Sequence, residues 1–447
     1  MNKLKEKILN PVFSKAEYII IGVILILCYV TFQHGDIAET AGHSMALLYG
    51  HILDFYNWNA INDMPASYPI ATYIVFAIWC IPLRIMGLGA TPTSDFPTYV
   101  LLYLKLLPTI IFFLDAYILR KIGESIGFGE RKSKVLMIAF ITMPLAVFSQ
   151  FIFGQYDSFT LFFVLLGVYY YFKRDFWKFV IAFGVALPFK AFAILLFVPL
   201  LLTCEKRIEQ IIKAVIVACV PYVLCALPFA GGAAYKQHAE NFYVFDYIFA
   251  AKFDVTYWNI SIVVLLMALL CGYAYFHEID LDNQEEFAAW SIYYCGLALG
   301  AFFCFSIWNP QWLLLLVPFL LLGAFMSKHN AVFHALDLLM FVVFAIFVAN
   351  QYGNVNEQLM RRGIWHDLFR QLGIVAQADL YVIHDNDLMF SLLSGIILIA
   401  TVFRHPKYRL EKYDGELGES MGWIRGKFYL GMAFYLIPMV ICAIAAL

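Results

Sequence analysis

Charged residues are scarce in this sequence. Lys, Arg, Asp and Glu make up 14% of the 447 residues and hydrophobic residues 63%, whereas a soluble domain has about 25% charged residues. A single buried core does not explain this excess, because apolar runs of membrane-spanning length recur along the whole chain. The net charge of −2 argues against a nucleic-acid partner.

Recognisable metal-binding and export signals are also missing. The nine cysteines fit no CxxC or Cys/His spacing and lie mostly in apolar runs, so we interpret them as buried thiols. The basic start is followed by an apolar run from about Tyr18 to Thr31 without an A-x-A-like site, which predicts a retained first span. We recognise no soluble accessory domain, low-complexity segment or clear internal repeat.

The apolar runs predict an all-α polytopic membrane protein with about 13 transmembrane helices (roughly 11–14), forming a single transmembrane domain over residues 1–447. The predicted spans are 17–33, 98–119, 135–151, 157–172, 177–189, 191–203, 211–230, 258–276, 287–305, 311–326, 333–350, 388–403 and 428–446. Residues 67–86 are predicted as a juxtamembrane helix on the outer face. A break is placed at Pro188 and Lys190, because proline interrupts the helical hydrogen bonds and lysine is costly at the bilayer centre.

The distribution of basic residues supports these assignments. With the N-terminus inside, 22 of the 30 Lys and Arg residues fall on inner segments. A full span at 67–86 would move the basic loop 120–134 to the wrong side. The polar clusters then gather on the outer face, in loops 34–97 and 351–387 and at span ends.

Two carboxylates directly follow the first span. Asp36 and Glu39 precede a predicted helix at Thr40–Tyr56. A carboxylate at the membrane surface can take a proton from a sugar hydroxyl and make it a nucleophile. Asp before a helix is equally a good N-cap, so both interpretations stay open.

Several cations are candidates for holding a phosphate. Lys190 lies between two apolar stretches, and a buried ammonium requires an anion, either a lipid phosphate or a structural carboxylate such as Asp157 or Asp115. Lys105 lies in the second predicted span, where a charge is functional by default or snorkels to the surface. The vicinal pair Arg361-Arg362 either clamps a phosphate or forms a solvated basic turn.

Amide and aromatic side chains near span ends are candidates for binding sugar hydroxyls. They are Gln155, Asp157, Asn309, Gln311, Trp308 and Tyr68. The alternatives are ordinary ones: a polar turn capped by Asp157, an aromatic belt anchor at Trp308, and a helix start at Tyr68-Pro69.

Taken in order, these segments resemble the GT-C superfamily of polyprenyl-phosphate-sugar-dependent membrane glycosyltransferases, of the bacterial type. The resemblance covers roughly residues 17–320. The matching segments are Asp36…Tyr49-Gly50…Tyr68-Pro69, Lys105-Leu-Leu-Pro…Asp115, Gly154-Gln155-Tyr156-Asp157-Ser158, Leu187-Pro-Phe-Lys190…Pro199 and Asn309-Pro310-Gln311-Trp312…Pro318.

The resemblance implies a GT-C-like catalytic module at 17–230 with variable helices at 231–447. It implies Asp36 as the base, although many members carry an adjacent acidic pair, so Glu39 remains an alternative. The implied reaction is inverting transfer of a hexose from a polyprenyl-phosphate donor to a lipid-linked or cell-surface glycan acceptor. It takes place outside a bacterial plasma membrane and needs no cofactor, with a divalent metal left open.

Two other classes share part of this pattern. An O-antigen-type polymerase or ligase also has many spans and external arginines, as in the loop 351–387. A lipid-linked sugar flippase or transporter would place polar residues along a path through both faces, often with inverted repeats.

Overall fold

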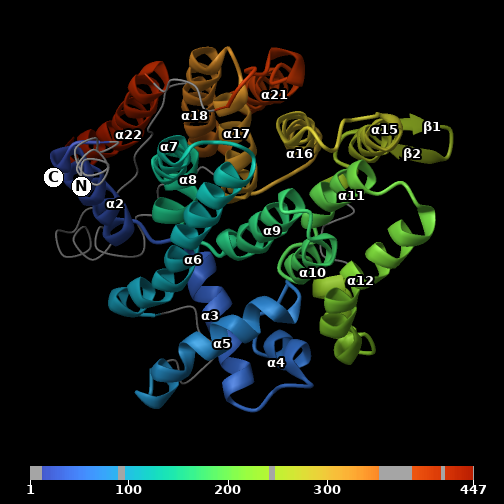
Figure 1. Cartoon of the computed structure of the whole chain (residues 1–447). Coiled ribbons are helices and arrows are strands. Elements are labelled where there is room, and N and C mark those ends of the chain that lie inside the picture. Colours follow the sequence, from blue (N-terminus) through green and yellow to red (C-terminus); the bar gives the residue numbers. More distant parts are fainter. Residues whose placement is uncertain (1–12, 89–95, 241–246, 352–384, 414–417, 446–447) are drawn as a thin grey trace, which may run out of the picture.

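A computed structural model of the chain (Figure 1) describes residues 13–88, 96–240, 247–351, 385–413 and 418–445. Nearly all regular structure in these ranges is helical, and a two-stranded hairpin is the one sheet among them. The chain is an all-α membrane protein, as its composition predicts.

The helices in the first half of the chain are α2 (Lys15–Thr31), α3 (Gly35–Leu48), α4 (Phe55–Ile61), α5 (Ile70–Ile85), α6 (Thr98–Ser125), α7 (Glu130–Ile141), α8 (Pro144–Val147), the π-helical η1 (Phe148–Phe153), α9 (Asp157–Phe172), α10 (Phe176–Ala186), α11 (Ala193–Cys204) and α12 (Ile208–Ala226). The later elements are η2 (Leu227–Phe229), α13 (Ala233–Tyr235), η3 (Lys236–Glu240), β1 (Lys252–Val255), β2 (Trp258–Ser261), α15 (Ile262–Phe276), α16 (Gln284–Phe305), η4 (Pro310–Leu315), α17 (Val317–Met326), α18 (Asn330–Gln351), α21 (Asn386–Val402), η5 (Pro406–Tyr408) and α22 (Gly418–Ala445).

Four of the described helices are long and apolar enough to cross a membrane. They are Thr98–Ser125, Ile208–Phe229, Gln284–Phe305 and Asn330–Val348. Two bent pairs, α2 with α3 at 61° and α7 with α8 and η1 at 51°, meet the same standard together, which raises the number to six. A helix occupies every predicted span, and α9 has the predicted bounds. Since the other apolar helices have 10–17 residues, a total of 13 crossings stays a prediction.

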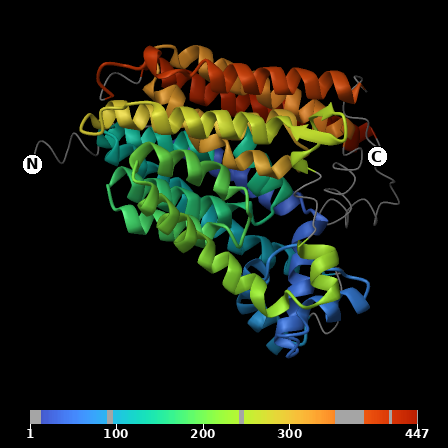
Figure 2. The ribbon, with the colours of Figure 1, turned by 90° about the vertical axis from the view of Figure 1, so that its right-hand side faces the viewer.

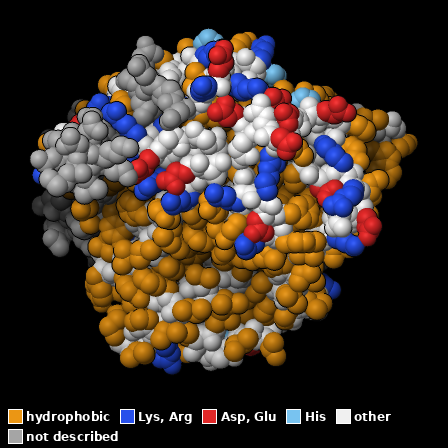
Figure 3. All heavy atoms as spheres, viewed as in Figure 1, with side chains coloured by type: hydrophobic (Ala, Val, Ile, Leu, Met, Phe, Trp, Pro, Cys, Tyr) orange, Lys and Arg blue, Asp and Glu red, His pale blue; other side chains and the backbone are white. Residues whose placement is uncertain are grey.

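The surface of the helix bundle is strongly apolar. On α12, Ile212, Ile216, Val220 and Leu224 recur every four residues, and each is at least 45% exposed. This spacing places them on one face of the helix, as expected for contact with lipid. Figure 3 shows nearly continuous hydrophobic surface over the region of α5, α6 and α12, while charged side chains gather over another part of the same view.

The helices α3, α4 and α5 form a small layer at one corner of the molecule. Figure 2 shows the long helices side by side, with α3–α5 and the end of α12 projecting from them. Tyr56 joins these parts, because its ring lies 5.0 Å from Phe229 and 4.8 Å from Tyr235, measured between centroids. This layer holds Asp36, the first candidate carboxylate, on α3 beside α6.

A buried lysine fixes the bend between α2 and α3. Lys105 on α6 donates hydrogen bonds to the carbonyl oxygens of Tyr29 (3.0 Å), Phe32 (2.8 Å) and Phe151 (2.7 Å). These acceptors belong to the end of α2 and to η1, where carbonyls lack the next turn of an α-helix as a partner. The three bonds therefore hold the break in the helix ladder in place.

Glycine at position 154 is required by the same contact. Gly154 ends η1 with φ +78°, and a Cβ there would lie 2.6 Å from Cε of Lys105. A residue with a side chain would be strained by the backbone and would displace the lysine stem. The turn that carries Gln155 and Asp157 thus packs directly on Lys105.

Two local predictions were wrong. The helix expected at Thr40–Tyr56 is two helices, and the first begins at Gly35 because His34 caps it. The span expected to begin at 258 begins at Ile262, because β2 pairs with β1 across a turn in which Thr256 has φ +53°. The tip of this hairpin exposes Tyr257 (91%) and Trp258 (77%).

Two other predictions are confirmed. The chain breaks around Pro188 and Lys190, since α10 ends at Ala186 and α11 begins at Ala193. The stretch 67–86 contains a helix, α5, which packs mainly on α3, while its juxtamembrane position on the outer face stays a prediction.

Candidate functional site

Three polar side chains from distant segments form one hydrogen-bonded chain. Gln155 Nε2 donates to Oδ2 of Asp36 (3.1 Å), which lies 119 positions earlier in the sequence. Gln311 Nε2 donates to Oε1 of Gln155 across 156 positions. The start of α3, the turn before α9 and the start of η4 therefore meet at one point.

Asp36 lies in the first turn of α3, where the helix dipole favours a negative charge. The N-cap is His34, so the interpretation of Asp36 as the cap was wrong. Nδ1 of His34 accepts the backbone N–H of Asp36 (3.2 Å), and the imidazole stacks on Phe153 at 3.9 Å between centroids. The Asp36 side chain is 32% exposed, so it is fixed in position yet open to an approaching molecule.

Glu39 lies one helical turn after Asp36 and is exposed. Gln155 bonds to Asp36, and through Gln155 this carboxylate joins the other two candidate segments. We therefore place Asp36 at the centre of the candidate site and Glu39 on its outer side.

Lys190 forms an ion pair with Asp157. Oδ1 of Asp157 accepts a hydrogen bond from Nζ of Lys190, and each side chain is 2% exposed. The structure thus has the structural carboxylate that the sequence left as an alternative. Asp157 begins α9, where the helix dipole stabilises its charge.

The ammonium of Lys190 also faces aromatic rings. Its Nζ lies 4.8 Å from the ring centroid of Trp312 and 5.7 Å from those of Tyr68 and Tyr156. Such contacts stabilise a desolvated cation. Among the described residues Asp157 is its one hydrogen-bond acceptor, so two of its three N–H groups remain for a ligand.

A partly open cavity lies beside this ammonium. Its wall includes Lys190 and the aromatic residues Tyr68, Phe189, Phe192, Tyr222, Tyr247 and Trp312. Burial, with the negative charges of Asp36 and Asp157, raises the pKa of the Tyr68 phenol well above its usual range. Tyr68 therefore stays a neutral hydroxyl between the cavity and the two carboxylates.

Two predicted site residues lie away from this cavity. Trp308 is 3% exposed, and its indole N–H donates to the carbonyl of Phe303 (2.7 Å) in the core. All three N–H groups of Lys105 bind backbone carbonyls, so it offers none to a phosphate. Both residues are structural in this arrangement, because main-chain acceptors already satisfy them.

The remaining predicted residues are less defined by the structure. Asn309 is half-buried at the N-cap of η4, and its side chain makes no capping bond. Arg361 and Arg362 lie outside the described residues. Asp115 is fully buried on α6, and neither of its oxygens has a hydrogen-bond partner among the described residues. Within the described ranges no group of three or more His, Cys, Asp or Glu residues could hold a metal ion.

Several residues of the site were not predicted. His34 lies two residues before Asp36, and this short spacing was the signal that could have found it. Trp312 lies four residues after Trp308 in the same segment, and only the start of η4 decides which indole faces Lys190. Tyr222 and Tyr247 carry no local signal, because they follow apolar or irregular sequence and reach the cavity through tertiary packing.

The comparisons with known proteins do not assign the chain to a family. No model of a known protein family matches it, and no curated protein is significantly similar to it. The fold and the site therefore define the class, an all-α integral membrane protein with a buried polar site, and they carry the functional argument alone.

Proposed function

We propose that the chain is a membrane-embedded glycosyltransferase of the GT-C type. It transfers a hexose from a polyprenyl-phosphate donor, with inversion, to a lipid-linked or cell-surface glycan acceptor. The reaction takes place on the non-cytoplasmic face of a bacterial plasma membrane.

The observation that carries this proposal is the meeting of a carboxylate, two amides and a cation from four separate segments. Asp36, Gln155 and Gln311 are hydrogen-bonded in series, and the Lys190–Asp157 pair adjoins them through Tyr68. Amide and carboxylate groups suit sugar hydroxyls, while an aromatic cavity with one ammonium suits an isoprenoid phosphate.

The groups support a single displacement. Asp36 takes the proton of the acceptor hydroxyl while the oxygen of that hydroxyl forms a bond to the anomeric carbon of the donor. The bond from this carbon to the phosphate oxygen breaks, and the phosphate leaves with the electron pair. Lys190 stabilises the charge that develops on this oxygen. Gln155 holds Asp36 in the required orientation.

The charge balance of the site explains why Asp157 is paired. Asp157 keeps Lys190 charged in surroundings where an isolated ammonium would lose its proton. The pair is formally neutral, so it attracts a phosphate through the direction of the two remaining N–H groups more than through net charge. Arg361 and Arg362 remain the proposed source of additional positive charge.

The test is sugar transfer by Asp36→Asn. Purified protein in lipid is given polyprenyl-phosphate hexoses with a radiolabelled sugar and a membrane glycolipid extract as acceptor. Asp36→Asn keeps an acceptor for Gln155 but not a base, so transfer falls about 10²–10⁴-fold, the usual contribution of a general base. The matched variant Glu39→Gln keeps its activity.

Three outcomes would contradict the proposal or its residue assignment. Full activity of Asp36→Asn with loss in Glu39→Gln would make Glu39 the base. Full activity of both would remove the acidic base from the mechanism. If the wild-type protein does not use the polyprenyl-phosphate hexoses but extends a pyrophosphate-linked oligosaccharide, the chain would be a polymerase and not this transferase.

A further inference from the structure

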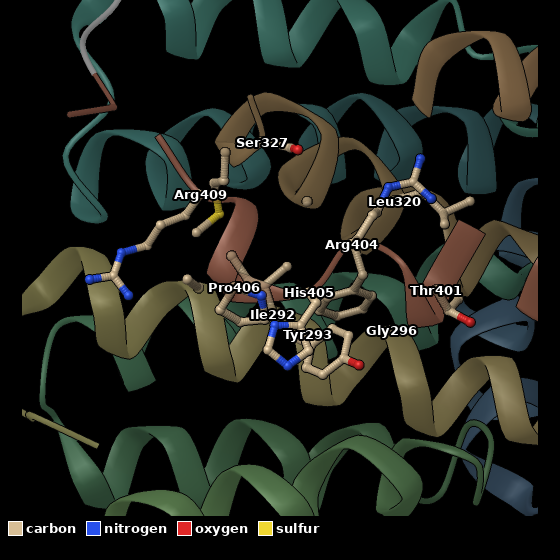
Figure 4. A pocket seen from close by; sticks show the side chains of 14 residues that line it. Ile292, Tyr293, Gly296, Leu320, Ser327, Thr401, Arg404, His405, Pro406 and Arg409 are labelled. Atoms are coloured by element: carbon tan, nitrogen blue, oxygen red, sulfur yellow. The ribbon is translucent and has the colours of Figure 1, made fainter. Parts of the chain in front are cut away.

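A second cavity lies among α16, α17 and the segment that follows α21. It is partly open to the surface, and Figure 4 shows the side chains that line it. Gly296 on α16 lines it, and no heavy atom lies within 4 Å of the place where its Cβ would be. The empty space therefore reaches the backbone of α16.

This cavity is at the opposite end of the bundle from the candidate site. Asp157 begins α9 at the candidate site, and the carbonyl of Phe172 at the other end accepts a hydrogen bond from Gln284 (3.0 Å). The 16 residues of α9 span about 24 Å at 1.5 Å per residue. Ala289 of the cavity follows Gln284 by little more than one turn. The positive-inside bias predicts that this end faces the cytoplasm.

A buried cluster with excess positive charge adjoins the cavity. Asp337 accepts bonds from Arg404 (2.6 Å) and Lys427 (3.1 Å), and these three side chains are at most 4% exposed. Nδ1 of His334 lies 3.3 Å from Nζ of Lys427, where a neutral imidazole accepts a bond. With both basic groups protonated, two cations and one anion leave one positive charge unbalanced, and a nearby anion would stabilise this charged form in a buried place.

Arg404 connects this cluster to the cavity. Its stem crosses Gly323, whose Cβ would lie 2.8 Å from Cδ of Arg404, and both residues line the cavity. The Nε atom of Arg404 is buried and has no acceptor among the described residues. One wall of the cavity is therefore positively charged.

The other side of the cavity has a basic and aromatic rim. Arg409 is about one-third exposed and uses one N–H on Glu286 (3.2 Å). The ring of His405 lies 5.1 Å from each of the rings of Trp290 and Tyr293. Figure 4 shows the guanidinium groups of Arg404 and Arg409 on opposite sides, with His405 and Tyr293 between them. Trp and Tyr beside basic groups are typical of the headgroup level of a membrane.

The surroundings favour a lipid over a soluble anion. Ile292 and Leu320 give the cavity an apolar wall. On the adjoining end of α21, Ile399, Val402 and Phe403 are 41–57% exposed, which is a lipid-facing surface. A molecule that fills the cavity from this side meets hydrocarbon first and the basic rim last.

We propose that this cavity binds the phosphate headgroup of an anionic phospholipid from the leaflet at this end of the bundle. The phosphate lies between Arg409 and the Arg404 wall and balances the unpaired charge of the Asp337 cluster. The acyl chains run along α21. Basic pockets between transmembrane helices recognise anionic headgroups in this way.

The test compares purified full-length protein in three bilayer discs: phosphatidylcholine alone, phosphatidylcholine with phosphatidylglycerol, and phosphatidylcholine with added inorganic phosphate. Thermal unfolding and mass spectrometry of bound lipid are measured. Gly296→Leu fills the cavity without changing charge, and Gly395→Leu, at another helical glycine with open space, is its control. Arg409→Gln removes the rim cation, and Lys412→Gln removes an exposed cation outside the cavity.

Phosphatidylglycerol is expected to raise the unfolding temperature of wild type and both controls. Gly296→Leu loses this rise and the bound lipid, and Arg409→Gln binds about fivefold more weakly, the effect of one basic residue at a membrane surface. An equal rise in Gly296→Leu and its control would overturn the proposal. If Gly296→Leu does not fold, equal lipid binding by Arg409→Gln and Lys412→Gln would do so. A rise in unfolding temperature with inorganic phosphate but not with phosphatidylglycerol would assign the cavity to a soluble anion and overturn the proposal of a lipid ligand.

Discussion

The charge on Lys190 depends on one partner, and this decides how its mutants are interpreted. Both members of the Lys190–Asp157 pair are almost fully buried. Removing one member of such a pair leaves an uncompensated charge and costs about 3–5 kcal/mol. Replacing both removes the charge altogether and costs much less.

We therefore expect different results from single and double replacement. Lys190→Met lowers the unfolding temperature strongly, and Lys190→Met with Asp157→Asn recovers most of it. Donor affinity, measured by titration with a polyprenyl-phosphate analogue, is lost in both. Wild-type affinity in the stable double variant would make the pair purely structural.

At the scale of single residues, the sequence predicted where a side chain lies better than it predicted which groups that side chain contacts. Asp36, Gln155 and Gln311 were selected because they lie at span ends on one predicted face, and they do meet. Trp308 was selected by the same rule and Lys105 as a charge inside a predicted span, yet backbone carbonyls satisfy both. Residue type and depth do not reveal which acceptor lies nearest, because that acceptor comes from another part of the chain.

At the scale of elements, the turn at Gly154 links the helix break to the site. Its positive φ and its contact with Lys105 connect η1, the end of α2 and the residues that follow, Gln155 and Asp157. A change in this turn thus affects both folding and the position of the amide.

Gly154→Ala is expected to destabilise the protein. A left-handed backbone costs about 1–2 kcal/mol for a residue with a Cβ, and the displaced lysine adds to this. Gly272→Ala on α15 is the control, since it has open space around it and alanine favours a helix by up to about 1 kcal/mol. Thermal unfolding should fall for Gly154→Ala alone. Equal midpoints for both variants would show that the turn is not constrained.

Helix positions were predictable, but their boundaries were not always. Apolar runs and proline located the helices of the predicted spans, including the break between α10 and α11. The start of α3 was missed because a histidine caps it, and β2 was missed because its pairing with β1 outweighs an apolar sequence. Capping by His34 and strand pairing depend on neighbours that an apolar pattern does not encode.

At the scale of the whole molecule, length limits what counts as a membrane crossing. A 16-residue helix such as α9 is about 24 Å long, short of the roughly 30 Å hydrocarbon core of a bilayer. Helices of this kind cross only together with their flanking turns. The apolar pattern therefore predicts where helices lie, whereas the number of crossings depends on how those turns are oriented.

The predicted sidedness can be tested with epitope tags. A tag after Asp63, between α4 and α5, is expected to bind antibody on intact spheroplasts, and one after Lys412 only after permeabilisation. The basis is the excess of Lys and Arg at the end of the bundle opposite the candidate site. Both tags must bind in permeabilised cells as the control. Binding of both tags on intact cells would contradict the arrangement.

The hairpin of β1 and β2 has a consequence for how the protein is held in the membrane. It presents a phenol and an indole, Tyr257 and Trp258, at the tip of a short hairpin. Such rings partition to the zone between water and hydrocarbon and resist movement in either direction. The hairpin thus fixes how deeply the start of α15 lies in the membrane, because α15 begins directly after it.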